Sequence, residues 1–228
     1  MKALQLILKT LLVTITGVTV CNAAAGDDKT SVLDFNEQTH LVFTCEEEKL
    51  ARHVYRVLGG RFPEISSFTA MAENKEDSNC AVRELLEKYR VSVPRVNHNV
   101  GVFSWGIYGR YFTEKYLALT SQGTSSPLSA LYVGAFIEEL SILDIKQCPT
   151  VLVDINNGIN DASACGMKYT DNPDVLDIYA DLLDESREHL RLLVSDIEKI
   201  SGTGKYQAQV LQQDEVDAIL SRGQIAQP

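Results

Sequence analysis

The 228-residue sequence lacks several features that mark common functional classes. It has no run of basic residues, and 31 acidic residues outnumber 21 lysines and arginines, which gives a net charge of −10. We therefore expect no nucleic-acid partner and no docking on anionic lipid. The absence of a Cys-x-x-Cys pair argues against a zinc knuckle or a thioredoxin-type site. The absence of a nucleophile elbow or triad spacing makes a nucleophilic hydrolase the least favoured class.

Internal repeats are also missing, and beyond residue 25 no apolar stretch is long enough to span a bilayer. The composition is otherwise ordinary, with 45% hydrophobic and 23% charged residues. This balance excludes a disordered chain, a collagen-like fibre and a coiled-coil rod, and the length favours one domain.

The N-terminus is typical of a secretory signal. Two lysines and no acid precede an apolar run from Thr10 to Val20, and small residues follow as far as Ala25. We predict a signal peptide over 1–25, cleaved near Ala25, and a short linker over 26–32. Lipid attachment at Cys21 is the alternative, disfavoured because Val20 is larger than the small residue usual there. The mature protein is expected to be secreted or extracytoplasmic and free of the membrane.

Helical periodicity dominates the rest of the chain. Asp34 and Glu37 form a capping-box pattern, Ser126-Pro127 and Asn172-Pro173 are typical helix starts, and Gly59-Gly60 is a typical stop. The predicted helices cover 34–58, 66–89, 111–120, 126–146, 172–197 and 213–221, with a loop excursion over 148–169. The fold class is therefore all-α: a four-helix bundle over 33–203, with an extra short helix before 126–146. A C-terminal extension over 204–228 carries another short helix.

Cysteines at positions 45, 80, 148 and 165 remain after cleavage, and an even count in an oxidising compartment favours disulfides. Spacing alone leaves three pairings open. The helix layout favours Cys45–Cys80 and Cys148–Cys165.

Acidic and histidine side chains fall on stripes that otherwise face the core. Glu47 is in phase with the apolar residues of its helix, Glu138 and Glu139 interrupt the most apolar segment, and His189 lies in line with leucines. Burying a lone carboxylate is costly unless it is paired or metal-bound, and inward carboxylates with histidine are how bundles bind iron or manganese. Taken singly, each has a plainer interpretation: Glu46–Glu48 as a solvated acidic turn, and His189 as a hydrogen-bonded core residue.

Five colinear motifs resemble an uncharacterised branch of the ferritin-like superfamily, a domain of unknown function. They cover Glu46–Tyr55, Gly134–Ile142, Thr170–Asp174, Ser186–Arg191 and Tyr206–Glu215, and the likeness extends over roughly 33–221. The resemblance implies a ferritin-like four-helix bundle and a di-metal carboxylate centre.

The chain departs from that family pattern where the second metal ligands belong. Lys75 and Ser78 stand in place of a Glu-x-x-His pair, and Ser141 stands in place of an acid. Lysine and serine are poor ligands, so half of the di-metal site is missing. The family alignment places Lys75 opposite Glu47 as an ion-pair partner, and Cys45 level with Cys80, where a disulfide would join the two helices.

Two functional hypotheses follow. The first is a secreted, non-catalytic bundle without a metal, which works through its surface or the 148–169 loop, with a protein partner or by self-association. The alternative is a mononuclear iron, manganese or zinc protein with oxidase or metal-handling activity. Its candidate ligands are Glu47, Glu138 or Glu139, and His189, with Glu185 assisting at i,i+4 spacing.

Overall fold

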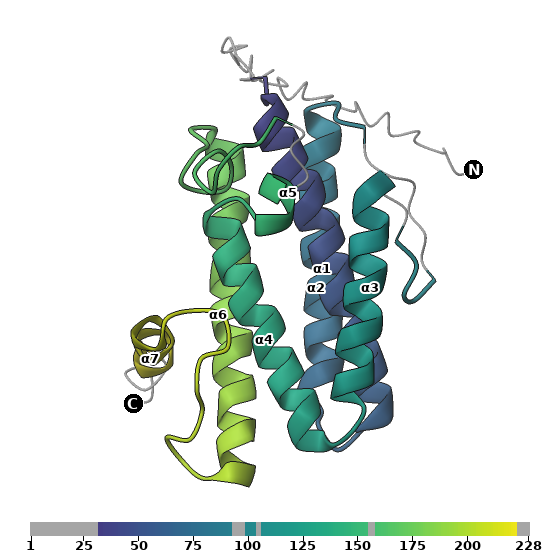
Figure 1. Ribbon diagram of the computed structural model, residues 1–228, viewed down its shortest axis with the longest axis vertical. Coiled ribbons are helices and arrows are strands. Elements are labelled where there is room, and N and C mark those ends of the chain that lie inside the picture. The colour runs from purple at the N-terminus through teal and green to yellow at the C-terminus, as the bar shows by residue number, and fades with distance from the viewer. Residues whose placement is uncertain (1–31, 93–98, 104–105, 155–157, 223–228) are drawn as a thin grey trace, which may run out of the picture. The chain divides into compact units, whose positions relative to one another are not determined.

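The computed structural model describes residues 32–92, 99–103, 106–154 and 158–222 (Figure 1). All regular structure in these ranges is helical. The seven helices are α1 (Phe35–Arg61), α2 (Ser67–Lys88), α3 (Gly106–Gly123), α4 (Pro127–Lys146), α5 (Thr150–Asp154), α6 (Pro173–Ser201) and α7 (Gln213–Arg222). None of these described helices is long and apolar enough to cross a membrane. The predicted signal peptide, its cleavage point and all but the end of the linker lie outside the described residues.

The predicted helix starts are confirmed by their hydrogen bonds. Glu37 N–H donates to Asp34 Oδ1 at 2.8 Å and Asp34 N–H donates to Glu37 Oε2 at 2.9 Å, which completes the capping box of α1. The Ser126 hydroxyl accepts from Ser129 N–H at the start of α4. Asn172 Oδ1 accepts from two N–H groups at the start of α6. These side chains satisfy amides that have no partner within their own helix.

Two helix boundaries differ from the sequence-based expectation. Helix α1 continues through Gly59-Gly60 and ends at Arg61, and the Phe62 N–H then donates to Leu58 O. Packing against α2 overrides the weak helix propensity of glycine here, since a Cβ on Gly59 would lie only 3.4 Å from Phe68 Cβ. Helix α3 is 18 residues long, not a short helix over 111–120.

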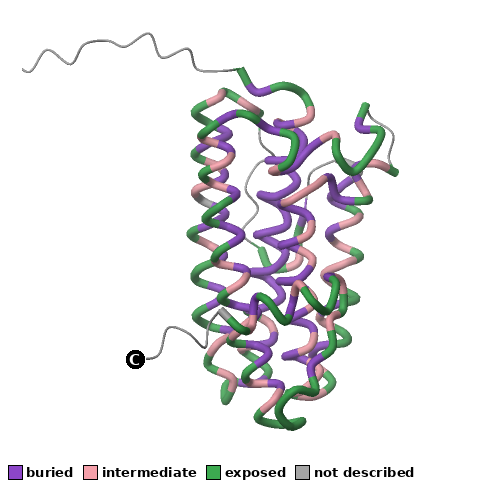
Figure 2. Tube along the Cα trace, turned by 90° about the vertical axis from the view of Figure 1, so that its left-hand side faces the viewer, coloured by how far each residue is buried: buried purple, intermediate pink, exposed green. Residues whose placement is uncertain are grey.

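Helix α1 lies inside the bundle. It packs against α2, α3 and α4, while α4 also packs along α6, and α6 contacts α2 (Figure 1). Every residue from Thr39 to Tyr55 is buried, including five charged ones. Figure 2 shows the buried segments on the inner sides of the surrounding helices and the exposed segments on the outer sides. The centre of this fold is therefore unusually polar.

The connection between α4 and α6 is closed by the predicted Cys148–Cys165 disulfide. This segment is not only loop, because α5 lies within it. The predicted Cys45–Cys80 pair is not observed: Cys45 is a free, buried thiol that accepts a hydrogen bond from Asn79 Nδ2, and the side chain of Cys80 lies outside the described residues.

Candidate functional site at the centre of the bundle

A single lysine occupies the centre of the bundle. Lys75 on α2 is fully buried, and its Nζ lies 3.2 Å from Glu48 Oε1, 3.4 Å from Glu185 Oε1 and 3.5 Å from Glu138 Oε2. The ammonium also donates to Ser186 Oγ at 3.3 Å. We call Lys75, Glu48, Glu138, Glu185 and His189 the Lys75 cluster. Its carboxylates come from α1, α4 and α6 and converge on one positive charge.

Glu138 is the most highly bonded carboxylate of the cluster. The Tyr55 hydroxyl donates to Glu138 Oε1 at 2.5 Å, and His189 Nδ1 lies 3.2 Å from the same oxygen. Burial alone would raise the pKa of Glu138, but Lys75 and His189, with the hydrogen bonds from His189 and Tyr55, lower it to about 2. Glu138 is therefore ionised across the whole physiological range.

Glu48 and Lys75 respond differently to the same environment. Burial raises the pKa of Glu48 to about 7, because the neighbouring Glu185 and Glu138 oppose its ionisation and Lys75 compensates only in part. Burial also disfavours the charged form of Lys75, yet the three carboxylates more than reverse this and raise its pKa. The lysine is a permanent cation, and Glu48 is the member that takes up a proton near neutral pH.

The cluster does not fit a di-metal centre. The ammonium stands at the point where the carboxylates converge, and lysine in its charged form offers no lone pair to a metal. Ser78, the second residue at a position where the resemblance implied a ligand, donates its hydroxyl to Glu185. Ser141 Oγ is buried without a hydrogen-bond partner among the described residues. Within these residues, no group of three or more His, Cys, Asp or Glu side chains is arranged to bind a metal ion.

The structure brings three of the five candidate ligands together and places Glu47 and Glu139 elsewhere. Glu138, Glu185 and His189 lie in the Lys75 cluster, with His189 Nδ1 3.9 Å from Glu185 Oε1. Glu47 does not: the expected Glu47–Lys75 pair is wrong, because Glu48 faces α2 and Glu47 turns toward Asp144 on α4. Burial, reinforced by Asp144, raises the pKa of Glu47 well above its usual value.

Asp144 was not identified from the sequence. Burial raises its pKa to about 7, against the hydrogen bond from Glu47 and the charge of Lys115. The two carboxyl groups therefore share a proton in a second buried acidic site, separate from the Lys75 cluster. The sequence did contain a signal for this residue, because Asp144 interrupts the apolar segment 142–145.

Glu139 faces away from the centre and binds the C-terminal extension. Its carboxylate accepts the backbone N–H groups of Gln209, Val210 and Leu211 at 2.6–2.9 Å and the hydroxyl of Tyr206. The side chain is fully buried, so these charge-assisted hydrogen bonds replace its hydration. Glu138 is thus the inward acid of the pair, and Glu139 fixes residues 206–211 against α4.

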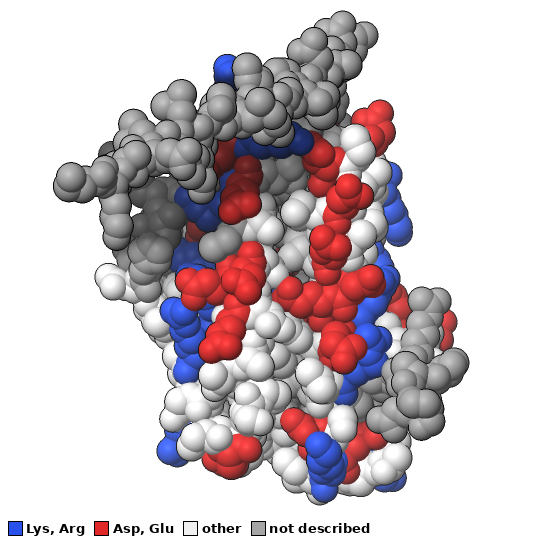
Figure 3. Space-filling view, turned by 180° about the vertical axis from the view of Figure 1, so that it is seen from behind, with Lys and Arg blue, Asp and Glu red and all other residues white. Residues whose placement is uncertain are grey.

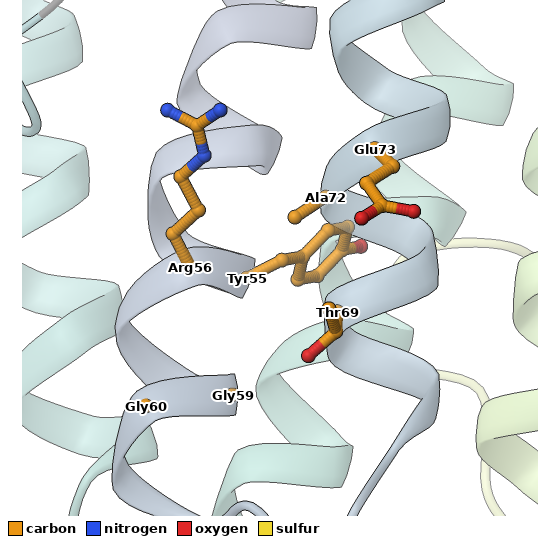
Figure 4. A pocket seen from close by; sticks show the side chains of 7 residues that line it. All are labelled: Tyr55, Arg56, Gly59, Gly60, Thr69, Ala72 and Glu73. Carbon is orange, nitrogen blue, oxygen red and sulfur yellow. The ribbon is translucent and has the colours of Figure 1, made fainter.

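A pocket of about 260 Å³ lies beside the cluster, between α1 and α2 (Figure 4). The space is left open because Gly59, Gly60 and Ala72 carry little or no side chain, and Tyr55 forms part of its lining. Since the Tyr55 hydroxyl bonds Glu138, its ring separates this pocket from the Lys75 cluster. The cluster is closed to solvent on this side.

Comparisons with known proteins give relatives for almost the whole described chain. Residues 37–223 match the family described as "Uncharacterized protein domain (DUF2202)". The "Uncharacterized protein MJ0754" of Methanocaldococcus jannaschii is 34% identical over 185 residues, which cover 81% of this chain and 86% of that protein. The crystal structure of hypothetical protein MJ0754 from Methanococcus jannaschii superposes with a TM-score of 0.68 at 32% identity, over 83% of this chain and 94% of that one.

Proposed function

Because this chain belongs to the DUF2202 family of uncharacterized domains, whose described relatives carry no named activity, we propose a function from its own central residues. We propose that it is an extracytoplasmic, ferritin-like bundle in which a lysine replaces the metal centre. It acts through binding and not through redox catalysis.

The observation that carries the proposal is the position of the Lys75 ammonium. Three carboxylates from three other helices lie within 3.5 Å of Nζ, so the lysine supplies the positive charge that these acids need. A buried acid cluster without a cation would be strongly destabilising. With Lys75 in place, the bundle is stable without a metal.

The ferritin-like assignment is supported by the origin of the cluster. Bundles of that kind build their centres from inward side chains on four helices. Here α1 supplies Glu48, α2 supplies Lys75, α4 supplies Glu138, and α6 supplies Glu185 and His189. In this proposal, the amine of Lys75 occupies the position that a metal ion would have in a carboxylate metal centre.

Extracytoplasmic location is supported by the signal-peptide pattern over 1–25 and is compatible with the Cys148–Cys165 disulfide. Expression of the full chain in a secreting host, followed by N-terminal sequencing of the exported protein, tests it. We expect the mature chain to begin at Gly26. Recovery of the uncut chain in the cytoplasm would contradict this part of the proposal.

The negative charge of the surface favours a partner that is not a polyanion. Figure 3 shows acidic side chains gathered in rows along one face of the molecule. Exposed acids on α2 and α6 include Glu73, Asp77, Asp181 and Asp184. Such a face repels nucleic acid and anionic membranes, so a protein partner or self-association is the expected mode of action.

Elemental analysis of the mature, tag-free protein tests the central claim. After incubation with Fe(II), Mn(II) or Zn(II) and dialysis, we expect far less than one metal ion per chain. The Lys75→Glu/Ser78→His variant restores a Glu-x-x-His pair on α2 and serves as the positive comparison. One metal per wild-type chain, lost on Glu138→Gln and on His189→Gln, would overturn the proposal.

That outcome would establish the alternative, a mononuclear iron, manganese or zinc protein. One observation favours it: Glu48 Oε2 is buried without a hydrogen-bond partner among the described residues, and Glu138 Oε2 and Glu185 Oε1 are held by ion pairs of 3.5 and 3.4 Å to Lys75 and not by hydrogen bonds. The ligands would then be Glu48, Glu138, Glu185 and His189, with Lys75 displaced, and neither Glu47 nor Glu139 would take part.

A further inference from the structure

A second pocket, of about 230 Å³, lies between α3, α4 and the C-terminal extension. Lys115, Leu119 and Gln122 of α3 line it, together with Val133 and Phe136 of α4 and Gln209 of the extension. None of these residues belongs to the Lys75 cluster. The pocket combines one cation, two amides and an apolar wall.

The cation in this pocket is not neutralised by a direct partner. Lys115 Nζ lies 5.5 Å from the ring centre of Tyr111 and 5.4 Å from that of Phe136. Among the described residues, no carboxylate oxygen lies within ion-pair distance of it. Cation–π contacts offset part of the cost of desolvating an ammonium but leave its charge uncompensated. An anion entering the pocket would meet that charge beside two aromatic rings.

The walls of the pocket are fixed before any ligand arrives. Gln209 is held by Glu139 through its backbone N–H and by Tyr132 O through its side-chain Nε2, at 2.8 Å. Leu119 and Val133 are buried, so they present a rigid apolar surface. The exposed side-chain amide of Gln122 makes no hydrogen bond to the described part of the chain and is free to donate one. A preformed site loses little entropy on binding.

We propose that this pocket binds a small organic anion: a carboxylate with a short aliphatic or aromatic tail. The carboxylate accepts hydrogen bonds from Lys115 Nζ and the Gln122 amide, and the tail packs against Leu119, Val133 and Phe136. Charge selects the head group and the apolar wall selects the tail. The inference does not depend on the metal-free core or on secretion.

The competing explanation is that Lys115 only balances the buried Glu47–Asp144 pair. Its charge opposes the rise in pKa that burial causes in both acids, but does not reverse it. The pair nevertheless retains a proton near neutral pH and makes no direct ion pair with Lys115. The Lys115 ammonium can therefore still form an ion pair with an anion from solution. A binding measurement separates the two explanations.

Amide NMR titration of the ¹⁵N-labelled full domain with benzoate and hexanoate, each compared with its neutral amide, is the test. We expect saturable shifts confined to 115–122, 133–136 and 206–211, and binding of each amide at least about tenfold weaker, which corresponds to about 1.4 kcal/mol. This comparison uses only wild-type protein, so it holds even if a variant fails to fold.

Three variants complete the design. Lys115→Met keeps the stem over the aromatic rings and is expected to weaken binding of the anions at least about tenfold. Ala118→Phe fills the pocket from its exposed rim and is expected to abolish binding. Lys199→Met removes one charge from an exposed lysine on α6 and should leave binding unchanged. No saturable shift with either anion up to about 10 mM, equal binding of the amides, or full affinity in Lys115→Met would overturn the proposal.

Discussion

Removing the central ammonium is the sharpest test of how this bundle is stabilised. Lys75→Met keeps most of the side-chain volume but deletes the charge that lies within 3.5 Å of three buried carboxylates. Loss of one partner from a buried ion pair costs about 3–5 kcal/mol, because the other charges remain without compensation. We expect the free energy of unfolding at about pH 8 to fall by that amount.

The loss should depend on pH, and its sign follows from the carboxyl groups. In the wild type, Lys75 and His189 hold the pKa of Glu138 at about 2, below the unfolded value of 4.5, so Glu138 stabilises the fold above pH 4.5. Without Lys75, burial raises the pKa of Glu138 and raises that of Glu48 further. An acid whose pKa is higher in the folded than in the unfolded state stays protonated in the fold after it has ionised in the unfolded chain. Such an acid therefore lowers the free energy of unfolding as the pH rises above 4.5. The difference in the free energy of unfolding between wild type and Lys75→Met should therefore shrink to about 1 kcal/mol at about pH 5, where Glu48 and Glu138 of the variant are protonated.

Urea denaturation followed by circular dichroism, in EDTA and with the disulfide intact, measures both values. Lys199→Met is the matched control, since that lysine is exposed and its loss should change stability by less than about 0.5 kcal/mol. The Lys75→Met/Glu138→Gln variant removes two opposite charges and should recover about 1–2 kcal/mol relative to Lys75→Met. A Lys75→Met deficit below about 1 kcal/mol at about pH 8, or one that does not change with pH, would refute this account of the core.

Three further predictions concern the periphery. Glu139→Gln should accelerate amide hydrogen exchange at 206–211 at least about tenfold while the helices stay protected, because the N–H groups of this segment lose a charged acceptor. Unchanged exchange in the variant would contradict this role of Glu139. Gly60→Ala should raise the free energy of unfolding by about 0.5 kcal/mol, since its Cβ would meet no atom within 4 Å, and a lower melting temperature would refute it. Cys148→Ser/Cys165→Ser should lower stability by about 2–4 kcal/mol, measured by thermal unfolding, and equal stability would show that the segment between these cysteines, which are 17 positions apart, needs no cross-link.

Local signals in the sequence were sufficient for most of the fold. The caps at Asp34, Ser126 and Asn172 act over three residues and are independent of tertiary packing, so their helices were predicted from the correct residues. Gly59-Gly60 was misread as a stop because its effect depends on what packs against it. In this fold the neighbour is α2, which the local sequence does not specify.

The polar centre was only partly predictable, for a specific reason. Phase along a helix identifies the inward face only when another face meets solvent, and α1 has none between Thr39 and Tyr55. Glu47 and Glu48 are both buried, and which of them meets Lys75 is decided by the packing of α1 against α2. The shared face of Glu48 and Tyr55, seven residues apart, was the available clue.

The choice between Glu138 and Glu139 was also beyond local reasoning. Their helix is apolar on every side, so both positions satisfy the same pattern. The outcome depends on residues 206–211, about seventy positions later in the chain, whose N–H groups surround Glu139. Lys75 was expected to form an ion pair with an acid of the first long helix, and it does so with Glu48 and not with Glu47.

The enclosure of α1 has a consequence for the folding reaction. Its buried polar side chains find partners on different helices: Glu48 on α2, Tyr55 on α4, and His40 on α6 through Tyr179. A partly assembled chain that lacks any one of these helices leaves a polar group buried and unbonded, or forces α1 to stay in water. Partly folded intermediates are therefore unstable at every stage, and the domain should fold in a single cooperative transition. For the same reason, a substitution of one of these polar residues should be tolerated only together with a matching substitution on the helix that carries its partner.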